Sequence, residues 1–122
     1  MFSGGNATVF VSGMDRSVRF YSEVLGLKLL YRFGDHWASI DAGGGLIIGL
    51  HPASTNSPAG RNGSITIGLQ CTGPIGQAVA LLKDKGVEFH GGVVDDGAVR
   101  IANFVDPDGH LLYMVEVREE HK

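Results

Sequence analysis

The side chains that could carry chemistry are few in this sequence and lie far apart. Its 122 residues include five histidines, one cysteine and 13 aspartates and glutamates. No two histidines stand in an HxH or HxxxH spacing and none begins an HxE, so no single element brings metal-binding side chains together. We expect His110 beside a turn, His121 in the polar tail and His90 at a strand end to be solvated. His36 and His51 remain as the histidines that could touch a ligand.

The other reactive groups have no supporting context. Cys71 has no neighbouring histidine or helix N-terminus that would activate its thiol as a nucleophile. The glycine run 43–45 separates two expected strands and does not precede a helix, which excludes the usual phosphate-binding loop. The sequence pairs none of the carboxylates that could act as an acid or base, namely Asp35, Asp41, Asp95 and Asp96. The catalytic residues, if there are any, stay unknown.

These groups must be positioned by elements whose patterns occur twice along the chain. Residues alternate over 6–11, and apolar residues then recur at helical spacing from Met14 to Leu25, where Gly26 ends the pattern. Residues 52–63 are rich in proline, glycine and small polar residues and predict a linker. A second set of patterns follows it. The expected strands are 6–11, 27–33, 36–41 and 46–51, then 64–69, 87–90, 97–105 and 110–117, with a second helix that starts near Ile75 and stops at Gly86.

Local motifs predict how the elements begin, end and turn. Ser12 and Asp15 have the spacing of a capping box at the start of the first helix. The glycine clusters at 43–45 and 91–92 predict tight turns between strands. Residues 106–109, with the sequence DPDG, suit a type I turn.

The two halves of the chain align as an internal repeat with an offset of about sixty residues. Any two amphipathic helices could align by chance, but the repeated order of strand, helix and glycine stop favours a duplication. The prediction is an α+β fold of two βαβββ modules in a single domain over 1–122, with module one at 6–51, the linker at 52–63 and module two at 64–117. The matching pairs are Met14 with Ile75, Ser17 with Ala78, Val18 with Val79, and Gly26 with Gly86.

Three motifs occur in an order and spacing that together are fairly specific. They are VSGMDRS at 11–17 with the FY and LGL that follow it, KGVEF at 85–89, and FVDPDGH at 104–110. They resemble the vicinal oxygen chelate superfamily, which contains glyoxalases, bleomycin resistance proteins and extradiol dioxygenases, and the resemblance covers about residues 6–116. Gly13 departs from it, since the family often has aspartate there. The resemblance implies curved sheets that form an open barrel around a cavity, commonly in a homodimer.

The resemblance also implies a divalent metal in many members, held by side chains on the first and last strands of each module. Carried over to this chain, the four ligand positions fall on Asn6, Gly49, Ser64 and Tyr113. None is a good metal ligand, and a shift of one residue reaches only apolar side chains. We therefore expect no metal and no other cofactor. Metal-free members such as the bleomycin resistance proteins sequester a drug without reaction.

The alternation predicts which side chains face the cavity. Ala7, Val9 and Val11, with Ile65, Ile67 and Leu69, are expected to pack under the helices. The opposite faces then present small polar groups and a few aromatics, a lining that suits a flat or partly apolar organic molecule. The aromatics could instead fill core space. The predicted ligand-binding residues are Asn6, Thr8, Phe10, Trp37, Gly49, His51, Ser64, Thr66 and Tyr113.

Charge and hydropathy exclude several classes of partner. The net charge is −3 with both signs interspersed, so there is no basic stripe for nucleic acid. No apolar run is long enough to cross a membrane, and residues 1–6 do not predict a secretion signal. The single cysteine suits a reducing compartment, so we expect a cytoplasmic protein.

The function expected from these observations is metal-independent binding of a small molecule, with a drug or metabolite sequestered in a cavity of a homodimer. One alternative is a metal-dependent glyoxalase-like lyase, isomerase or dioxygenase with unusual ligands such as His36 or His51. Another is a sensing or partner-binding module whose cavity is vestigial. Whether the barrel closes within one chain or by exchange of modules between subunits stays open.

Overall fold

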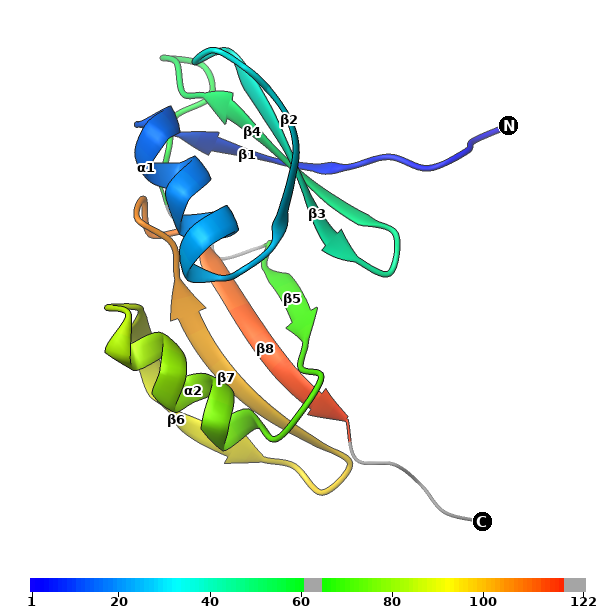
Figure 1. The fold of residues 1–122 in the computed structure, drawn as a ribbon, viewed down its shortest axis with the longest axis vertical. Coiled ribbons are helices and arrows are strands. Elements are labelled where there is room, and N and C mark those ends of the chain that lie inside the picture. Colours follow the sequence, from blue (N-terminus) through cyan, green and yellow to red (C-terminus); the bar gives the residue numbers. More distant parts are fainter. Residues whose placement is uncertain (61–64, 118–122) are drawn as a thin grey trace. The chain divides into compact units, whose positions relative to one another are not determined.

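The chain forms two compact units, Met1–Arg61 and Asn62–Lys122, in a computed structural model that describes residues 1–60 and 65–117 (Figure 1). Each unit has the element order βαβββ, so the predicted α+β fold of two similar modules is confirmed. The first unit contains β1 (Ala7–Val11), α1 (Met14–Arg19), a π-helical turn η1 (Phe20–Val24), β2 (Lys28–Phe33), β3 (Trp37–Gly43) and β4 (Leu46–Pro52). The second contains β5 (Ile67–Gln70), α2 (Ile75–Asp84), β6 (Glu88–Asp95), β7 (Val99–Val105) and β8 (Leu111–Val117).

The two sheets share one topology. The strand order is β1-β4-β3-β2 in the first unit and β5-β8-β7-β6 in the second. In both, the first strand pairs in parallel with the last, and the other pairs are antiparallel. Gly26 and Gly86, which follow the two helices, have φ of +77° and +89°, a conformation that favours glycine and ends a helix. A duplicated module predicts this agreement.

The core of the first unit lies between α1 and the sheet, with α1 against β4 (Figure 1). Because strand side chains alternate between faces, every second residue of β1, β3 and β4 is buried under the helix. The buried residues are Val9, Val11, Ala38, Ile40, Ile48 and Leu50 from the strands, and Met14, Val18, Phe20 and Tyr21 from the helical segment. The intervening residues form the face of the sheet that α1 does not cover.

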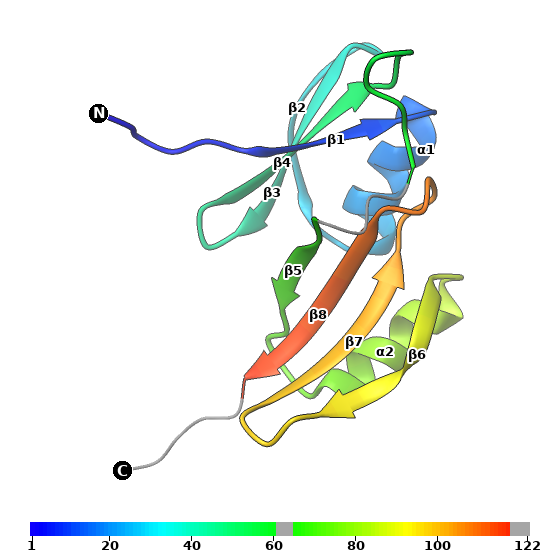
Figure 2. The same ribbon diagram turned by 180° about the vertical axis from the view of Figure 1, so that it is seen from behind.

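The second unit repeats this arrangement, with α2 against β6, β7 and β8 on one face of the sheet (Figure 2). Its buried residues are Ile75, Val87, Ala102, Phe104, Val105, Leu112 and Met114. The start of α2 is tied to the sheet, because the Ile75 N–H donates to Glu116 Oε1 at 2.9 Å. Ile65 was expected in this core, but it precedes β5 and is 69% exposed. That prediction is wrong because the strand begins at Ile67, three residues later than the predicted start at 64.

The predicted capping box is also wrong. Gly13 occupies the N-cap position of α1 and makes no side-chain cap bond. Ser12, one residue too early to cap, instead accepts a hydrogen bond from Arg16 Nη2 at 2.6 Å. The Asp15 carboxylate accepts one from Arg32 Nη2 at 2.6 Å. Both side chains therefore bind arginines in place of the helix backbone.

Glycine clusters have different roles in the two modules. Gly44 and Gly45 make the predicted turn between β3 and β4, with φ of +62° and +90°. Gly91 and Gly92, predicted as a turn, lie inside β6. Gly91 has φ of +78° and the pairing with β7 shifts register between His90 and Val94. A bulge absorbs the positive φ there, so the strand continues through the glycines.

Residues 106–109, with the sequence DPDG, form the predicted turn, and the Asp106 carboxylate stabilises it. The Gly109 N–H donates to the Asp106 carbonyl at 2.9 Å. Asp106 Oδ1 accepts from the N–H groups of Asp108 and His110, and Oδ2 lies 2.8 Å from His110 Nδ1. The side chain of His110 is only 15% exposed, so the expectation that it is solvated is wrong, because the buried carboxylate draws the imidazole in. His121 and Ser64 lie outside the described residues.

Within the described ranges, 1–60 and 65–117, none of the helices has the length and apolar character that crossing a membrane requires.

Candidate functional site

The sheet of the first unit presents an aromatic surface on the side opposite α1. The strand register places Gly49 of β4 between Thr8 of β1 and Ser39 of β3. Phe10 lies beside His51 in the next row. Trp37 is two residues from Ser39 and therefore shares its face. We call this set the aromatic face; it consists of Thr8, Phe10, Trp37, Ser39, Gly49 and His51.

Trp37 covers Gly49. A Cβ atom on Gly49 would lie 2.3 Å from Trp37 Cη2 and 2.7 Å from Cζ2, so a larger residue at this position must displace the indole. The indole Nε1–H donates to Ser39 Oγ at 2.7 Å, which holds the ring over the glycine. Trp37 is half-buried, so part of the ring stays open. Glycine at 49 thus makes room for an aromatic platform on the sheet.

His51 stands beside this platform. Its ring centroid is 5.6 Å from that of Phe10 and 6.4 Å from that of Trp37, with interplanar angles of 64° and 71°. The imidazole therefore contacts both rings in the edge arrangement that aromatic quadrupoles favour. Its Nδ1 lies 2.9 Å from the Pro52 carbonyl oxygen. A carbonyl can only accept, so Nδ1 carries the proton and Nε2 of the neutral ring is an acceptor.

The second unit contains the same combination of glycine and aromatic ring. Gly68 of β5 lies opposite Tyr113 of β8, and a Cβ at Gly68 would be 2.3 Å from Tyr113 Cζ. Asn103 flanks Tyr113 on β7. The hydroxyl of Thr66, which precedes β5, donates to the Leu111 carbonyl at 3.0 Å. An aromatic ring thus covers a glycine in each module, but at different places: Trp37 of β3 covers Gly49 on the last strand of the first unit, and Tyr113 on the last strand of the second unit covers Gly68 on its first strand.

These positions do not fit the divalent metal that the family resemblance implies. Asn6 precedes β1, and the first-strand residue beside Gly49 is Thr8. Tyr113 has Gly68 as its neighbour on β5. The four ligand positions carried over from the family supply neither imidazole nor carboxylate; they are Asn6, Gly49, Ser64 and Tyr113. The rings of Trp37 and Tyr113 fill the space above Gly49 and Gly68. Over residues 1–60 and 65–117, no three His, Cys, Asp or Glu side chains gather to hold a metal ion.

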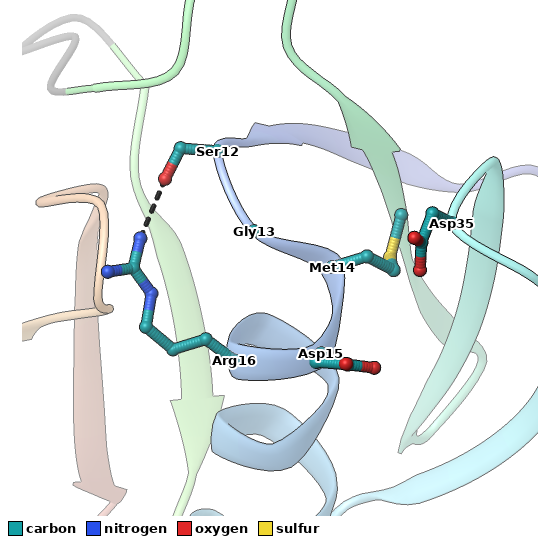
Figure 3. Close-up of a pocket in the computed structure, with 6 residues that line it drawn as sticks. All are labelled: Ser12, Gly13, Met14, Asp15, Arg16 and Asp35. Carbon is teal, nitrogen blue, oxygen red and sulfur yellow. Dashed lines mark hydrogen bonds between the residues drawn. The ribbon is translucent and has the colours of Figure 1, made fainter.

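A polar hollow of about 470 Å³ lies at the start of α1 and contains none of the aromatic-face residues (Figure 3). Arg32 Nη2 binds Asp15 at 2.6 Å and Asp35 at 3.0 Å, so the two carboxylates share one guanidinium. The hydrogen bond from Arg32 holds the pKa of Asp15 below its usual value, and Asp15 raises the pKa of Arg32. Both carboxylates of the hollow are thereby engaged. Its lining residues are Ser12, Gly13, Met14, Asp15, Arg16 and Asp35.

The remaining candidates from the sequence lie apart from the aromatic face. His36 is exposed in the turn between β2 and β3, where its ring is 5.4 Å from Phe33. His90 is exposed, and its Nε2 lies 3.0 Å from Glu88 Oε2. Burial, with a smaller contribution from Glu116, raises the pKa of the Cys71 thiol. Ser39 was missed by the sequence reasoning, although the alternation that starts at Trp37 reaches it.

Comparisons with known proteins agree with this architecture. The family model of the Glyoxalase/Bleomycin resistance protein/Dioxygenase superfamily matches residues 5–114. No curated protein matches the sequence. TnmS3, an antibiotic binding protein from Streptomyces sp. CB03234, superposes with a TM-score of 0.78 at 24% identity, over 97% of this chain and 98% of that one.

Two further solved structures are similar to the chain. A glyoxalase/bleomycin resistance protein from the same Streptomyces strain has a TM-score of 0.73 and 26% identity, over 92% of this chain and 98% of that one. A superfamily member from Sphaerobacter thermophilus DSM 20745 has a TM-score of 0.77 and 23% identity, over 95% and 98%.

Proposed function

The chain belongs to the glyoxalase/bleomycin resistance protein/dioxygenase superfamily, and from this premise we propose that it binds a planar organic molecule, a drug or a metabolite, without a metal. The observation that carries the proposal is the Trp37 ring over Gly49, with the His51 ring at a steep angle to it and the Phe10 ring at a steep angle to His51. An aromatic ring that lies flat on the sheet, with a second ring standing at its edge, can bind a flat apolar molecule by stacking. Neighbouring polar groups then orient the bound molecule.

Metal independence is supported by the residues beside the platform. A family-type metal site needs three or four imidazole or carboxylate ligands on the first and last strands. The cross-strand neighbours on those strands are Thr8 with Gly49 and Gly68 with Tyr113. A glutamate introduced at Gly49 would meet the indole before it reached a metal. That TnmS3, which shares this fold, is an antibiotic binding protein supports the binding of a small organic molecule.

We further propose that two copies of the chain assemble and that both units contribute to one domain. β2 is an edge strand of its sheet, and Leu30, Tyr31 and Phe33 on it are 49%, 57% and 60% exposed. Neighbouring exposed apolar side chains on one edge are typical of a surface that a partner covers. Light scattering after gel filtration would then give twice the mass of the chain, and Tyr31→Lys with Phe33→Lys would give the monomer. A monomeric wild type would contradict the assembly.

The single thiol of Cys71 supports a cytoplasmic setting.

Elemental analysis and a ligand screen test the central proposal together. We expect purified protein to hold no stoichiometric Zn, Ni, Fe or Mn, and a panel of planar antibiotics and metabolites to raise its melting temperature in the presence of a chelator. Trp37→Leu should abolish the shift, while the control Phe2→Leu, which alters an exposed side chain preceding β1, should keep it. A stoichiometric metal, or stabilisation only when metal is added, would contradict metal-independent binding.

A further inference from the structure

We propose that His51 Nε2 accepts a hydrogen bond from a hydroxyl group on the edge of the bound molecule, so that the aromatic face selects phenols over their ethers. This inference rests on the proposed function and names the chemical class of its ligand. It follows from which polar groups of the face are already engaged and which are left to the ligand.

Two hydrogen-bond donors of the aromatic face are engaged within the protein. The indole N–H, the sole polar group of Trp37, donates to Ser39 Oγ at 2.7 Å. The hydroxyl of Thr8 donates to Asn6 Oδ1 at 2.9 Å. The platform therefore offers a stacked molecule the surface of the indole, and neither of these groups has a hydrogen left to donate to a ligand acceptor.

His51 differs, because its bonding leaves an acceptor. Nδ1 donates to the Pro52 carbonyl at 2.9 Å, which fixes the tautomer of the neutral ring and leaves the lone pair on Nε2. The edge contacts with Phe10 and Trp37 hold the plane of the imidazole. His51 is exposed, so a ligand can reach the nitrogen.

Two charged residues lie on the same side of the sheet as the aromatic face. Asp41 follows Trp37 and Ser39 on this side of β3, and its carboxylate accepts the Gly43 N–H at 2.8 Å. Lys28 of β2 pairs with Asp41 in the sheet register. Among the described residues, the ring and hydrogen-bond contacts of His51 are with Phe10, Trp37 and the Pro52 carbonyl. With Nδ1 donating to that carbonyl, Nε2 is the ring nitrogen that can accept from an O–H group.

The preferred ligand is then a flat aromatic ring system with a hydroxyl group on its rim. The ring stacks on Trp37, and the hydroxyl reaches the neighbouring imidazole, whose centroid lies 6.4 Å from that of the indole. Methylation of the hydroxyl keeps the ring and removes the hydrogen. One neutral hydrogen bond of this kind corresponds to about a three- to tenfold preference for the phenol.

Two probes test the proposal, namely 2-naphthol and 2-methoxynaphthalene, in which a methyl group replaces the hydroxyl hydrogen. Their dissociation constants are measured by equilibrium dialysis with wild type, His51→Phe and His51→Gln. His51→Phe keeps a ring against Phe10 and Trp37 but has no acceptor, whereas His51→Gln supplies an amide oxygen. The control is His36→Phe, which removes an exposed histidine outside the face. Circular dichroism verifies that each variant is folded.

We expect wild type and His36→Phe to bind 2-naphthol about three- to tenfold more tightly than the ether. In His51→Phe the preference should vanish through weaker naphthol binding with unchanged ether binding, and His51→Gln should restore part of it. Equal binding of both probes by wild type, or an equal loss of both in His51→Phe, would overturn the inference while leaving stacking on Trp37 intact. If neither probe bound, the proposed function itself would fail for this ligand class.

Discussion

Replacing Gly49 with alanine tests the Trp37 platform through stability and fluorescence. The new Cβ would lie 2.3 Å from the indole, whereas ordinary contacts begin near 3.4 Å, so the ring must move by about 1 Å. Overpacking of this kind costs about 1–3 kcal/mol, and the lower chain entropy of alanine in the unfolded state returns about 0.5–1 kcal/mol. The displaced indole also weakens its 2.7 Å hydrogen bond to Ser39. We expect a net loss of about 1–2 kcal/mol in the free energy of unfolding.

The matched control is the same substitution at Gly76, on the exposed side of α2. A Cβ there meets no atom within 4 Å, and alanine is favoured over glycine in a helix by up to about 1 kcal/mol. Urea unfolding followed by far-UV circular dichroism should therefore give opposite signs for Gly49→Ala and Gly76→Ala. Trp37 is the single tryptophan, so its emission spectrum should change only in Gly49→Ala. Unchanged emission and stability in Gly49→Ala would refute the platform geometry.

Three further predictions concern buried or titratable groups. Ser17 is fully buried, and its Oγ has no hydrogen-bond partner among the described residues. Ser17→Ala introduces the residue type found at the equivalent Ala78 and should raise the free energy of unfolding by about 1 kcal/mol. A lower free energy of unfolding would contradict this. Asp106→Ala leaves two backbone N–H groups and His110 without their carboxylate, so urea unfolding should show a loss of about 2–4 kcal/mol, and a loss well below 1 kcal/mol would count against its role. Burial raises the pKa of the Cys71 thiol above its value in the unfolded chain. The contribution of this thiol to the free energy of unfolding is therefore complete below the unfolded pKa and falls as pH rises through the native pKa. Cys71→Ser should lack this dependence of stability on pH. Iodoacetamide should likewise modify the native thiol more slowly than the unfolded one, and equal rates would contradict the shift.

Periodicity was enough to predict the elements, because the amphipathic patterns are strong and the burial they indicate is real. Val9, Val11, Ile48 and Leu50 are buried as alternation requires. The exceptions are local. Ile65 lies outside its strand, and the bulge at Gly91 replaces a turn because the sequence does not say whether a positive φ will reverse the chain or be absorbed in a strand.

The candidate site was predictable as a face, but its working geometry was not. Period two groups Thr8 with Phe10 and Gly49 with His51 on their strands, and the family resemblance predicted that both pairs face the cavity. The register that joins them to Trp37 came from the structure. That the indole folds over Gly49 depends on a diagonal contact between strands, and the tautomer of His51 depends on a carbonyl beside it. Rotamers and hydrogen-bond partners of this kind follow from three-dimensional packing, for which the linear sequence has no code. The polar hollow at the start of α1 likewise forms from separate segments, because Asp35 lines it together with residues 12–16.

Titration of the single tryptophan with a planar aromatic ligand, with and without EDTA, tests the central claim most directly. Metal-independent binding on the aromatic face predicts a saturable change in Trp37 emission that EDTA does not alter and that Phe10→Ala with His51→Ala weakens. No saturable change, or a change that EDTA abolishes and added zinc restores, would contradict it.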